Sequence, residues 1–264
     1  MRIDFHTHVF PPKLAVGAID KLAKESGYIP ETNGTIEGLL AKMDIWGVDT
    51  AVTANIAVTP HSEKKVNDFA IATNDLQRIV AFGSVHPASE QAICELHRLK
   101  EAGIKGIKLH PEYQQFDIDD PIAYPIYETC QSLGLVTLFH AGFDVAYPDS
   151  RRAYPDRAAN IIRDFPDLKI VLAHFGANHG AGEVRETLVG KNVYFDISLL
   201  YEQGLTPVEA ETMIRTHGAD KILMATDCPW GSIPKVEAFL AETDLTQDEL
   251  FQIRYGNAKR LLGI

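Results

Sequence analysis

The sequence predicts an α/β protein folded as a single (β/α)₈ TIM barrel. Eight short, apolar and β-branched runs recur along the chain, helix-like segments separate them, and residues able to do chemistry follow most of the runs. Near-continuous apolar runs of this kind are typical of strands buried on both faces of a parallel sheet. Eight such units in 264 residues fit one barrel domain over residues 1–264 better than an open doubly wound sheet, which is the alternative.

The expected strands follow one another at the spacing that a strand–helix unit requires. They cover residues 2–9, 48–57, 79–87, 103–111, 135–142, 169–176, 193–198 and 221–230. Helix-start signals lie between them at Thr35, Ser89 and Thr206, and glycines such as Gly103 and Gly134 end helices shortly before the next strand. Residues 11–34, which have a helical-looking middle, and residues 143–160 are expected to be long loops, where barrel proteins gather substrate contacts.

Charge and cysteine content restrict the function classes. The net charge is −11, with 36 acidic against 25 basic residues, so we expect neither nucleic acid nor an anionic membrane as a partner. Three cysteines far apart predict no disulfide framework and a reducing compartment. With no signal peptide and no membrane-spanning run in sight, we expect a cytoplasmic protein that acts on a small molecule. The sequence leaves open whether the protein forms a homodimer.

Polar residues gather where the expected strands end. In a barrel, these carboxyl ends surround the active site. Placing an imidazole or carboxylate directly after a buried apolar strand costs free energy unless the group is paired or bound to a metal. The residues are His6 and His8 on strand one, His86 on strand three, Lys108 and His110 on strand four, His140 on strand five, His174 on strand six, Asp196 and Ser198 on strand seven, and Asp227 on strand eight.

Four of these residues suggest a metal site. His6 and His8 lie on one side of the first strand, because side chains alternate along a strand. With His140 and Asp227 they supply three neutral nitrogens and one carboxylate. This set suits one divalent metal ion, Zn²⁺ first, with Mn²⁺ or Fe²⁺ as alternatives. The competing interpretation is a set of unrelated histidines that only form hydrogen bonds within the fold.

Five motifs occur in an order that resembles a known superfamily. They are Asp4-Phe-His6-Thr-His8, Phe139-His140-Ala-Gly142, Leu172-Ala-His174-Phe-Gly176, Ala225-Thr226-Asp227-Cys-Pro-Trp230 and the closing Ile253-Arg-Tyr-Gly-Asn257-Ala-Lys-Arg-Leu-Leu262. Together they resemble the amidohydrolase superfamily of metal-dependent hydrolases. More narrowly, they resemble its amidohydrolase-related branch, which also contains the aminocarboxymuconate-semialdehyde and resorcylate decarboxylases.

The resemblance implies roles for three residues. Asp227 would bind the metal and accept a proton from the attacking water, and His174 would act beside the metal as a base or electrophile. Some members of the superfamily bridge two metals with a carboxylated lysine at the end of strand four, so Lys108 is an alternative bridge. The branch that the chain resembles is generally mononuclear, which favours a pocket or structural charge for Lys108.

The expected substrate contacts are His110, Trp230, Arg151 and Arg152. His110 shares a strand face with Lys108, and Trp230 follows Asp227 and would wall the pocket. If either arginine folds over the pocket, it would clamp a substrate carboxylate; the alternative is a pair of solvated surface charges.

Three further residues receive lesser roles. His179 is expected at the rim of the pocket. Asp4 is expected one layer below His6, where it would orient a histidine. Cys228 faces away from Asp227 along the strand, so we do not expect it to bind metal.

We expect hydrolysis of an ester, lactone or amide bond in a small, carboxylated molecule through a metal-activated water. Metal-dependent non-oxidative decarboxylation is the alternative, and 264 residues leave little room for the long inserted loops of larger decarboxylases of the branch. A metal-free binding protein is the third interpretation, but it would require a broken ligand set, and all four positions are filled.

Overall fold

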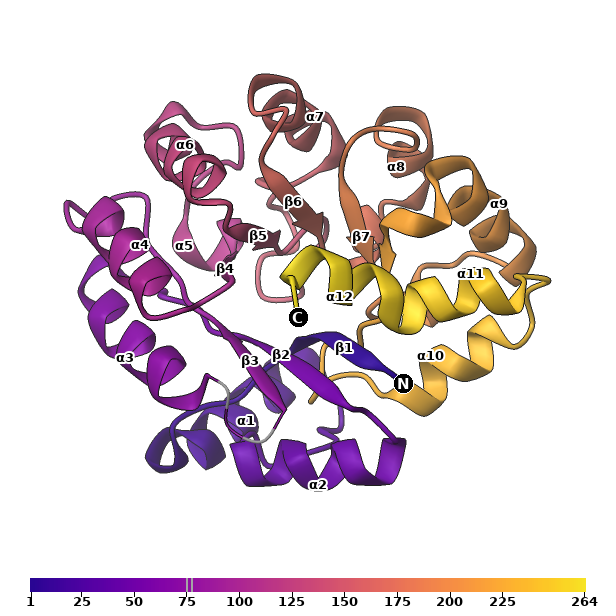
Figure 1. Cartoon of the computed structure of the whole chain (residues 1–264), viewed down its shortest axis with the longest axis horizontal. Coiled ribbons are helices and arrows are strands. Elements are labelled where there is room, and N and C mark those ends of the chain that lie inside the picture. Colours follow the sequence, from indigo (N-terminus) through magenta and orange to yellow (C-terminus); the bar gives the residue numbers. More distant parts are fainter. Residues whose placement is uncertain (75, 77) are drawn as a thin grey trace.

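Eight parallel strands form a closed ring in the computed structural model, which describes residues 1–74, 76 and 78–264 (Figure 1). One sheet contains β1 (Ile3–Thr7), β2 (Thr50–Ala54) and β3 (Ile79–Phe82). The other contains β4 (Gly106–Leu109), β5 (Val136–Phe139), β6 (Lys169–Leu172), β7 (Tyr194–Asp196) and β8 (Ile222–Leu223). Single bridges from Gly83 to Ile107 and from Thr7 to Cys228 join the two sheets at both edges. The ring is the predicted (β/α)₈ barrel.

Each strand lies inside its expected range but ends earlier. The fourth observed strand, for example, ends at Leu109, although the apolar run continues to residue 111. At the ends of β6 and β8 the backbone leaves the extended conformation, with φ of 57° at His174 and 62° at Asp227. Residues in this left-handed region cannot continue a strand. The residues that carry the chemistry therefore turn out of the sheet into the space above it.

Helices surround the ring (Figure 1). The outer layer consists of α2 (Ile36–Trp46), α3 (Glu63–Thr73), α4 (Ala92–Glu101), α6 (Tyr124–Leu133), α7 (Pro155–Asp164), α8 (Ala181–Thr187), α9 (Pro207–His217) and α10 (Ile233–Leu240). Two expected caps are present: Thr35 Oγ1 accepts a hydrogen bond from Gly38 N, and Thr206 forms a capping box with Glu209. The additional helices are α1 (Pro12–Ser26), α5 (Pro111–Gln114), α11 (Gln247–Phe251) and α12 (Asn257–Leu262).

The two segments expected as long loops contain helices. α1 fills most of residues 11–34, with Pro12 at its first position and Gly27 in the left-handed conformation after its end. Proline is favoured at the start of a helix and glycine just past its end, so the local sequence supports the observed bounds. Within residues 143–160, α7 begins at Pro155, which leaves residues 143–154 as the loop.

The inside of the barrel is apolar and closed at one end. Inward-facing side chains such as Phe5, Phe82 and Leu138 pack together with Leu261 and Leu262 of α12. α12 crosses the centre of the ring in Figure 1, so it covers the end of the barrel away from the strand termini that bear His6 and Asp227. The opposite end is the one available to a ligand.

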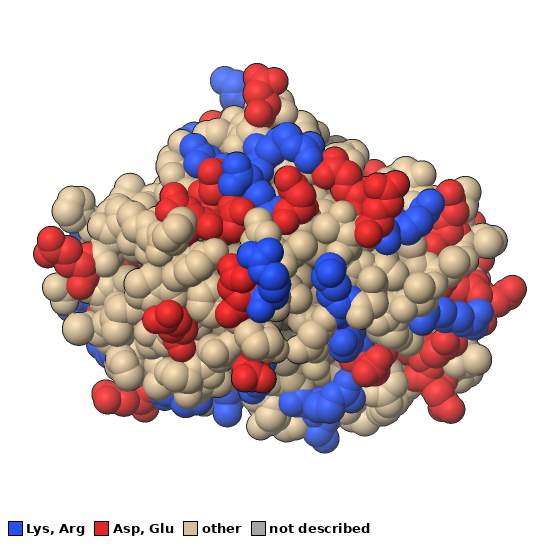
Figure 2. Space-filling model, turned by 90° about the horizontal axis from the view of Figure 1, so that it is seen from above, with Lys and Arg blue, Asp and Glu red and all other residues tan. Residues whose placement is uncertain are grey.

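Basic and acidic side chains are interleaved on the face that Figure 2 shows, so its described residues present no continuous basic surface to a polyanion. Among the residues that the structure describes, no helix combines the length and apolar character needed to cross a membrane.

We expect Asn257→Ala to lower the free energy of unfolding by about 2–4 kcal/mol. Asn257 is buried and its Nδ2 donates to Ala219 O at 2.7 Å and to Ile222 O at 2.8 Å, which fastens α12 to β8. Urea unfolding measures the change. The control is Asn192→Ala, because exposed Asn192 donates to Pro166 O alone among the described residues. Equal, small effects of both variants would contradict this role of Asn257.

Candidate active site

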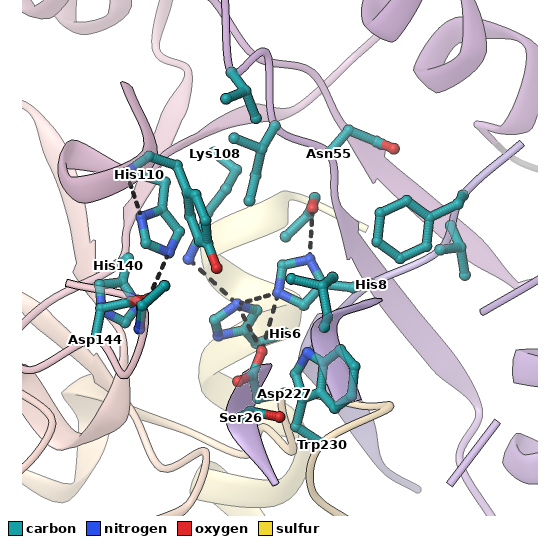
Figure 3. Close-up of a pocket in the computed structure, with 18 of the residues that line it drawn as sticks. His6, His8, Ser26, Asn55, Lys108, His110, His140, Asp144, Asp227 and Trp230 are labelled. Carbon is teal, nitrogen blue, oxygen red and sulfur yellow. Dashed lines mark hydrogen bonds and ion pairs between the residues drawn. The ribbon is translucent and has the colours of Figure 1, made fainter. Parts of the chain in front are cut away.

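One cavity of about 610 Å³ lies above the carboxyl ends of the strands. The residues predicted from the strand ends reach it from β1, β4, β5, β6 and β8. Figure 3 shows most of them pointing toward one another. The predicted residues that line the cavity are His6, His8, Lys108, His110, His140, His174, His179, Asp227 and Trp230.

Three of the four expected metal ligands converge at the floor of this cavity. His6 Nε2 and His8 Nε2 lie 3.2 Å apart. Asp227 Oδ1 lies 3.0 Å from His8 Nε2 and 3.4 Å from His6 Nε2. Burial opposes ionisation of Asp227, yet the neighbouring His6 and His8 hold the pKa of its carboxyl well below its usual range. We call His6, His8 and Asp227 the floor triad.

The outer nitrogens of the two histidines fix their tautomers. His8 Nδ1 lies 2.9 Å from Ala54 O, and His6 Nδ1 lies 2.9 Å from Asp196 Oδ2. A carbonyl or carboxylate oxygen can only accept, so both Nδ1 atoms carry the proton and both Nε2 atoms present a lone pair. When both rings are neutral, the floor triad therefore brings three acceptors together, and Lys108 Nζ, 3.2 Å from His6 Nε2, is a donor beside them. A divalent cation fits this donor set, since nitrogen and carboxylate ligands suit Zn²⁺ and related ions.

His140 departs from the expected shell. It belongs to a second group with His110 and Asp144 that could hold a metal ion. Its ring is stacked on His110 with centroids 4.1 Å apart, and its Nδ1 lies 3.2 Å from His174 Nε2. These two contacts orient the His140 ring and place it in that group. Three of the four expected ligands therefore lie in one group and His140 lies in the neighbouring one, so its place in the metal shell stays a prediction.

A directional chain of hydrogen bonds sets the protonation of His174 and His140. Ser198 Oγ donates to Asp196 Oδ1 and accepts from His174 Nδ1 at 2.9 Å. His174 Nε2 then carries a lone pair and accepts from His140 Nδ1. His140 Nε2 is left with a lone pair, and it is buried without a hydrogen-bond partner among the described residues. Such an orphaned acceptor is a suitable ligand for a cation.

Asp196 was expected at the end of strand seven, but no role in the site followed for it from the sequence. Its carboxylate is fully buried and contacts His6 Nδ1, His174 N and Ser198. Burial alone would raise its pKa, but His6 and the hydrogen bonds that Asp196 accepts lower the pKa to about 2. Its place at the end of β7 was the available signal, because the other strand ends supply the site.

Lys108 points at the floor triad. Its side chain is buried, and Nζ lies 3.2 Å from His6 Nε2, the lone-pair nitrogen. Burial lowers the pKa of Lys108 to about 8, while burial lowers the pKa of His6 to about 4. At neutral pH the lysine therefore brings a positive charge next to a neutral imidazole.

Arg151 and Arg152 do not form the expected carboxylate clamp. Arg151 is exposed, pairs with Glu183 at 2.8 Å and lies over the Tyr154 ring. Arg152 Nη1 contacts Asp117 at 3.3 Å, and its backbone N donates to buried Glu112. These partners hold both arginines outside the cavity lining. Arg152 instead helps to fasten the loop after β5 to the segment after β4.

The remaining predicted residues take simpler places. Asp4 Oδ1 accepts from His6 N at 3.3 Å and Thr226 N at 3.0 Å, so it holds the backbones of β1 and the β8 end rather than an imidazole. His110 Nδ1 accepts from Tyr113 N, and its Nε2 lies 3.5 Å from Asp144 Oδ2. Burial raises the pKa of Asp144 to about 6.

Solved structures of similar shape are barrel proteins. An uncharacterised TIM-barrel protein from Bordetella bronchiseptica superposes with a TM-score of 0.76 at 20% identity, covering 99% of this chain and 98% of that one. 5-Carboxyvanillate decarboxylase from Sphingomonas paucimobilis gives 0.73 at 18%, covering 100% and 99%. A dihydroxybenzoic acid decarboxylase from Polaromonas sp. JS666, solved with bound manganese, gives 0.69 at 18%, covering 99% and 96%. At these identities the likeness shows the fold alone.

Sequence comparisons show the family. A dihydroorotase from Variovorax paradoxus is 26% identical over 164 residues, which are 50% of this chain and 47% of the relative. A dihydroorotase from Aliivibrio fischeri is 33% identical over 109 residues, or 38% and 31%. The chain thus spans half or less of the length of these curated relatives. The family model described as "Amidohydrolase" matches residues 3–264, and the chain therefore belongs to the amidohydrolase family of enzymes.

Proposed function

We propose that this enzyme is a metal-dependent hydrolase that cleaves an ester, lactone or amide bond of a small molecule. The observation that carries the proposal is the floor triad, in which two histidine lone pairs and a carboxylate oxygen meet at the bottom of a closed-ended cavity. The volume of about 610 Å³ is in the range of small-molecule sites.

The floor triad would hold one divalent metal ion, Zn²⁺ first and Mn²⁺ or Fe²⁺ as alternatives, with the free Nε2 of His140 as a further candidate ligand. When bound, the ion would supply Lewis acidity to the substrate carbonyl and to the attacking water. Side chains of this chain would carry out the proton transfers. Their protonation states define which of them can accept a proton and which can donate one.

Asp227 would accept the proton of the attacking water, since its carboxylate borders the cavity beside the proposed ion. The water oxygen bonds to the carbonyl carbon, the carbon–oxygen or carbon–nitrogen bond breaks, and the proton passes to the leaving group. His174 Nε2 carries a lone pair, which favours an acceptor role over an electrophilic one; to take a proton there, His174 would first release its hydrogen bond from His140 Nδ1. The Lys108 ammonium would stabilise negative charge on the carbonyl oxygen.

Non-oxidative decarboxylation is equally well supported by the comparisons, and Lys108 is the observation that favours it. In that reaction the carbon–carbon bond breaks, carbon dioxide leaves, and the electron pair left on carbon takes a proton. A buried ammonium beside the floor triad could give that proton. Against it, Lys108 is the only buried Lys or Arg side chain among the described residues that line the cavity. A substrate carboxylate would find no arginine there.

We expect Asp227→Asn to lose most of the divalent metal that the wild-type chain retains after purification without chelators. The substitution keeps the shape of the side chain but removes the negative charge from the donor set. Elemental analysis after dialysis measures moles of metal per chain. The matched control is Asp144→Asn, which alters the carboxylate of the second group, with His110 and His140. Full occupancy in Asp227→Asn would exclude it as a ligand, and selective loss in Asp144→Asn would move the metal to the second group.

We expect Asp196→Asn to weaken metal binding about 10- to 100-fold, because His6 loses the acceptor that keeps its proton on Nδ1. Competition with a chromophoric chelator measures the affinity, and nitrogen chemical shifts of the imidazoles report the tautomers. Ser198→Ala is the control, since it breaks only the branch to His174. Unchanged tautomers and affinity in Asp196→Asn would show that Asp196 only supports the fold.

We expect His174→Asn to keep the metal and to lower turnover about 10²- to 10⁴-fold. The assay offers a panel of esters, lactones and amides and, in parallel, aromatic carboxylic acids with detection of carbon dioxide. Acid release from the first panel would support hydrolysis, while carbon dioxide release alone would establish the decarboxylase. The control is His179→Asn at the exposed rim, which should keep its turnover. Equal activity of both variants would remove His174 from the chemistry.

A further inference from the structure

The cavity is divided between a polar floor and apolar walls. His6, His8, Lys108 and Asp227 lie together at the floor, with His110 and His140 beside them, as Figure 3 shows. Above them the wall is built largely from aliphatic and aromatic side chains, among them Val9, Phe10, Ile56, Phe69, Phe143 and Leu199. A ligand that reaches beyond the floor therefore meets surface that gains free energy by being covered with apolar groups.

Charges away from the floor are few. Among the described lining residues outside the floor, the Asp, Glu, Lys and Arg side chains are Glu25 and Lys65, both exposed, and Asp144, which is partly buried. Arg151 and Arg152, which the sequence suggested as a carboxylate clamp, are held elsewhere by Glu183 and Asp117. An anionic group above the floor would meet no arginine; among the described lining residues there, the single exposed cation Lys65 is outnumbered by Glu25 and Asp144.

The apolar wall continues to the mouth of the cavity. Leu14 of α1, Val58 after β2 and Val145 after β5 line the cavity and are also 61%, 46% and 46% exposed. Three separate segments of the chain thus place large apolar side chains at one opening. Exposed apolar residues that are continuous with a cavity mark a surface that a ligand covers.

We propose that the substrate is amphipathic: its ester, lactone or amide group lies at the floor, and an uncharged aliphatic or aromatic body runs along the wall to Leu14, Val58 and Val145. The proposal rests on the hydrolase function above and names the class of substrate for that site. It differs from the carboxylated substrate expected from the sequence, whose candidate clamp, Arg151 and Arg152, lies outside the cavity lining.

A series of alkyl hydroxamates tests the proposal, because the hydroxamate head chelates zinc and the tail can be varied. Acetohydroxamate, hexanohydroxamate and octanohydroxamate are titrated calorimetrically into zinc-loaded protein, with the eight-carbon hydroxamate that ends in a carboxylate as the charged comparison. We expect each added methylene to tighten binding about threefold until the tail reaches the mouth. The terminal carboxylate should cancel most of that gain.

Two variants of α1 locate the tail. Leu14 and Val16 are 61% and 64% exposed on the same helix, but only Leu14 lines the cavity. Leu14→Glu should weaken octanohydroxamate at least fivefold and leave acetohydroxamate unchanged. Val16→Glu should change neither Kd, and both variants should unfold at the wild-type temperature, because neither side chain is buried.

The outcomes separate this inference from the proposed function. Failure of acetohydroxamate to bind zinc-loaded protein would overturn both, since the cavity floor would then present no ion that a ligand can chelate. Binding of acetohydroxamate without any gain from longer tails, or with a gain from the terminal carboxylate, would overturn the amphipathic substrate alone. Equal effects of Leu14→Glu and Val16→Glu would likewise overturn the path along α1.

Discussion

The hydrogen bond from His6 Nδ1 to Asp196 Oδ2 is the interaction on which the rest of the site depends. Because the carboxylate can only accept, the His6 lone pair must lie on Nε2, where it meets His8 and Asp227. The other oxygen of Asp196 accepts from Ser198 and so sets the direction of the bonds through His174 to His140. One buried charge at the end of β7 thereby defines the proton positions of three imidazoles.

The barrel makes this arrangement possible. Its parallel strands bring all their carboxyl ends to one side, and α12 covers the other. At His174 and Asp227 the backbone turns to positive φ, which lifts their side chains off the sheet and toward the axis. Backbone ties such as Asp4 to His6 N and Thr226 N hold the first and last strands in register. The loops and α1 above the floor complete the cavity.

Local sequence was sufficient wherever the physical cause is local or periodic. Apolar runs identified all eight strands, because burial on both faces imposes that pattern. Thr35 and Thr206 marked helix starts, since their capping bonds reach only three residues along the chain. The positions of His6, His8 and Asp227 at strand ends were enough to expect that they meet. The ordered motifs were enough to expect the family that the match over residues 3–264 then showed.

Contacts distant in sequence decided the rest. His140 lies with His110 and Asp144 because ring stacking and its bond to His174 orient its side chain, and neither is encoded in a strand pattern. The Arg152 side chain lies outside the cavity because its Nη1 contacts Asp117, while its backbone N donates to Glu112, 40 residues earlier in the chain. The sequence by itself determined the barrel and the residues that surround its open end. Only the tertiary structure decided which of them touch, because side-chain direction depends on neighbours that the fold brings together.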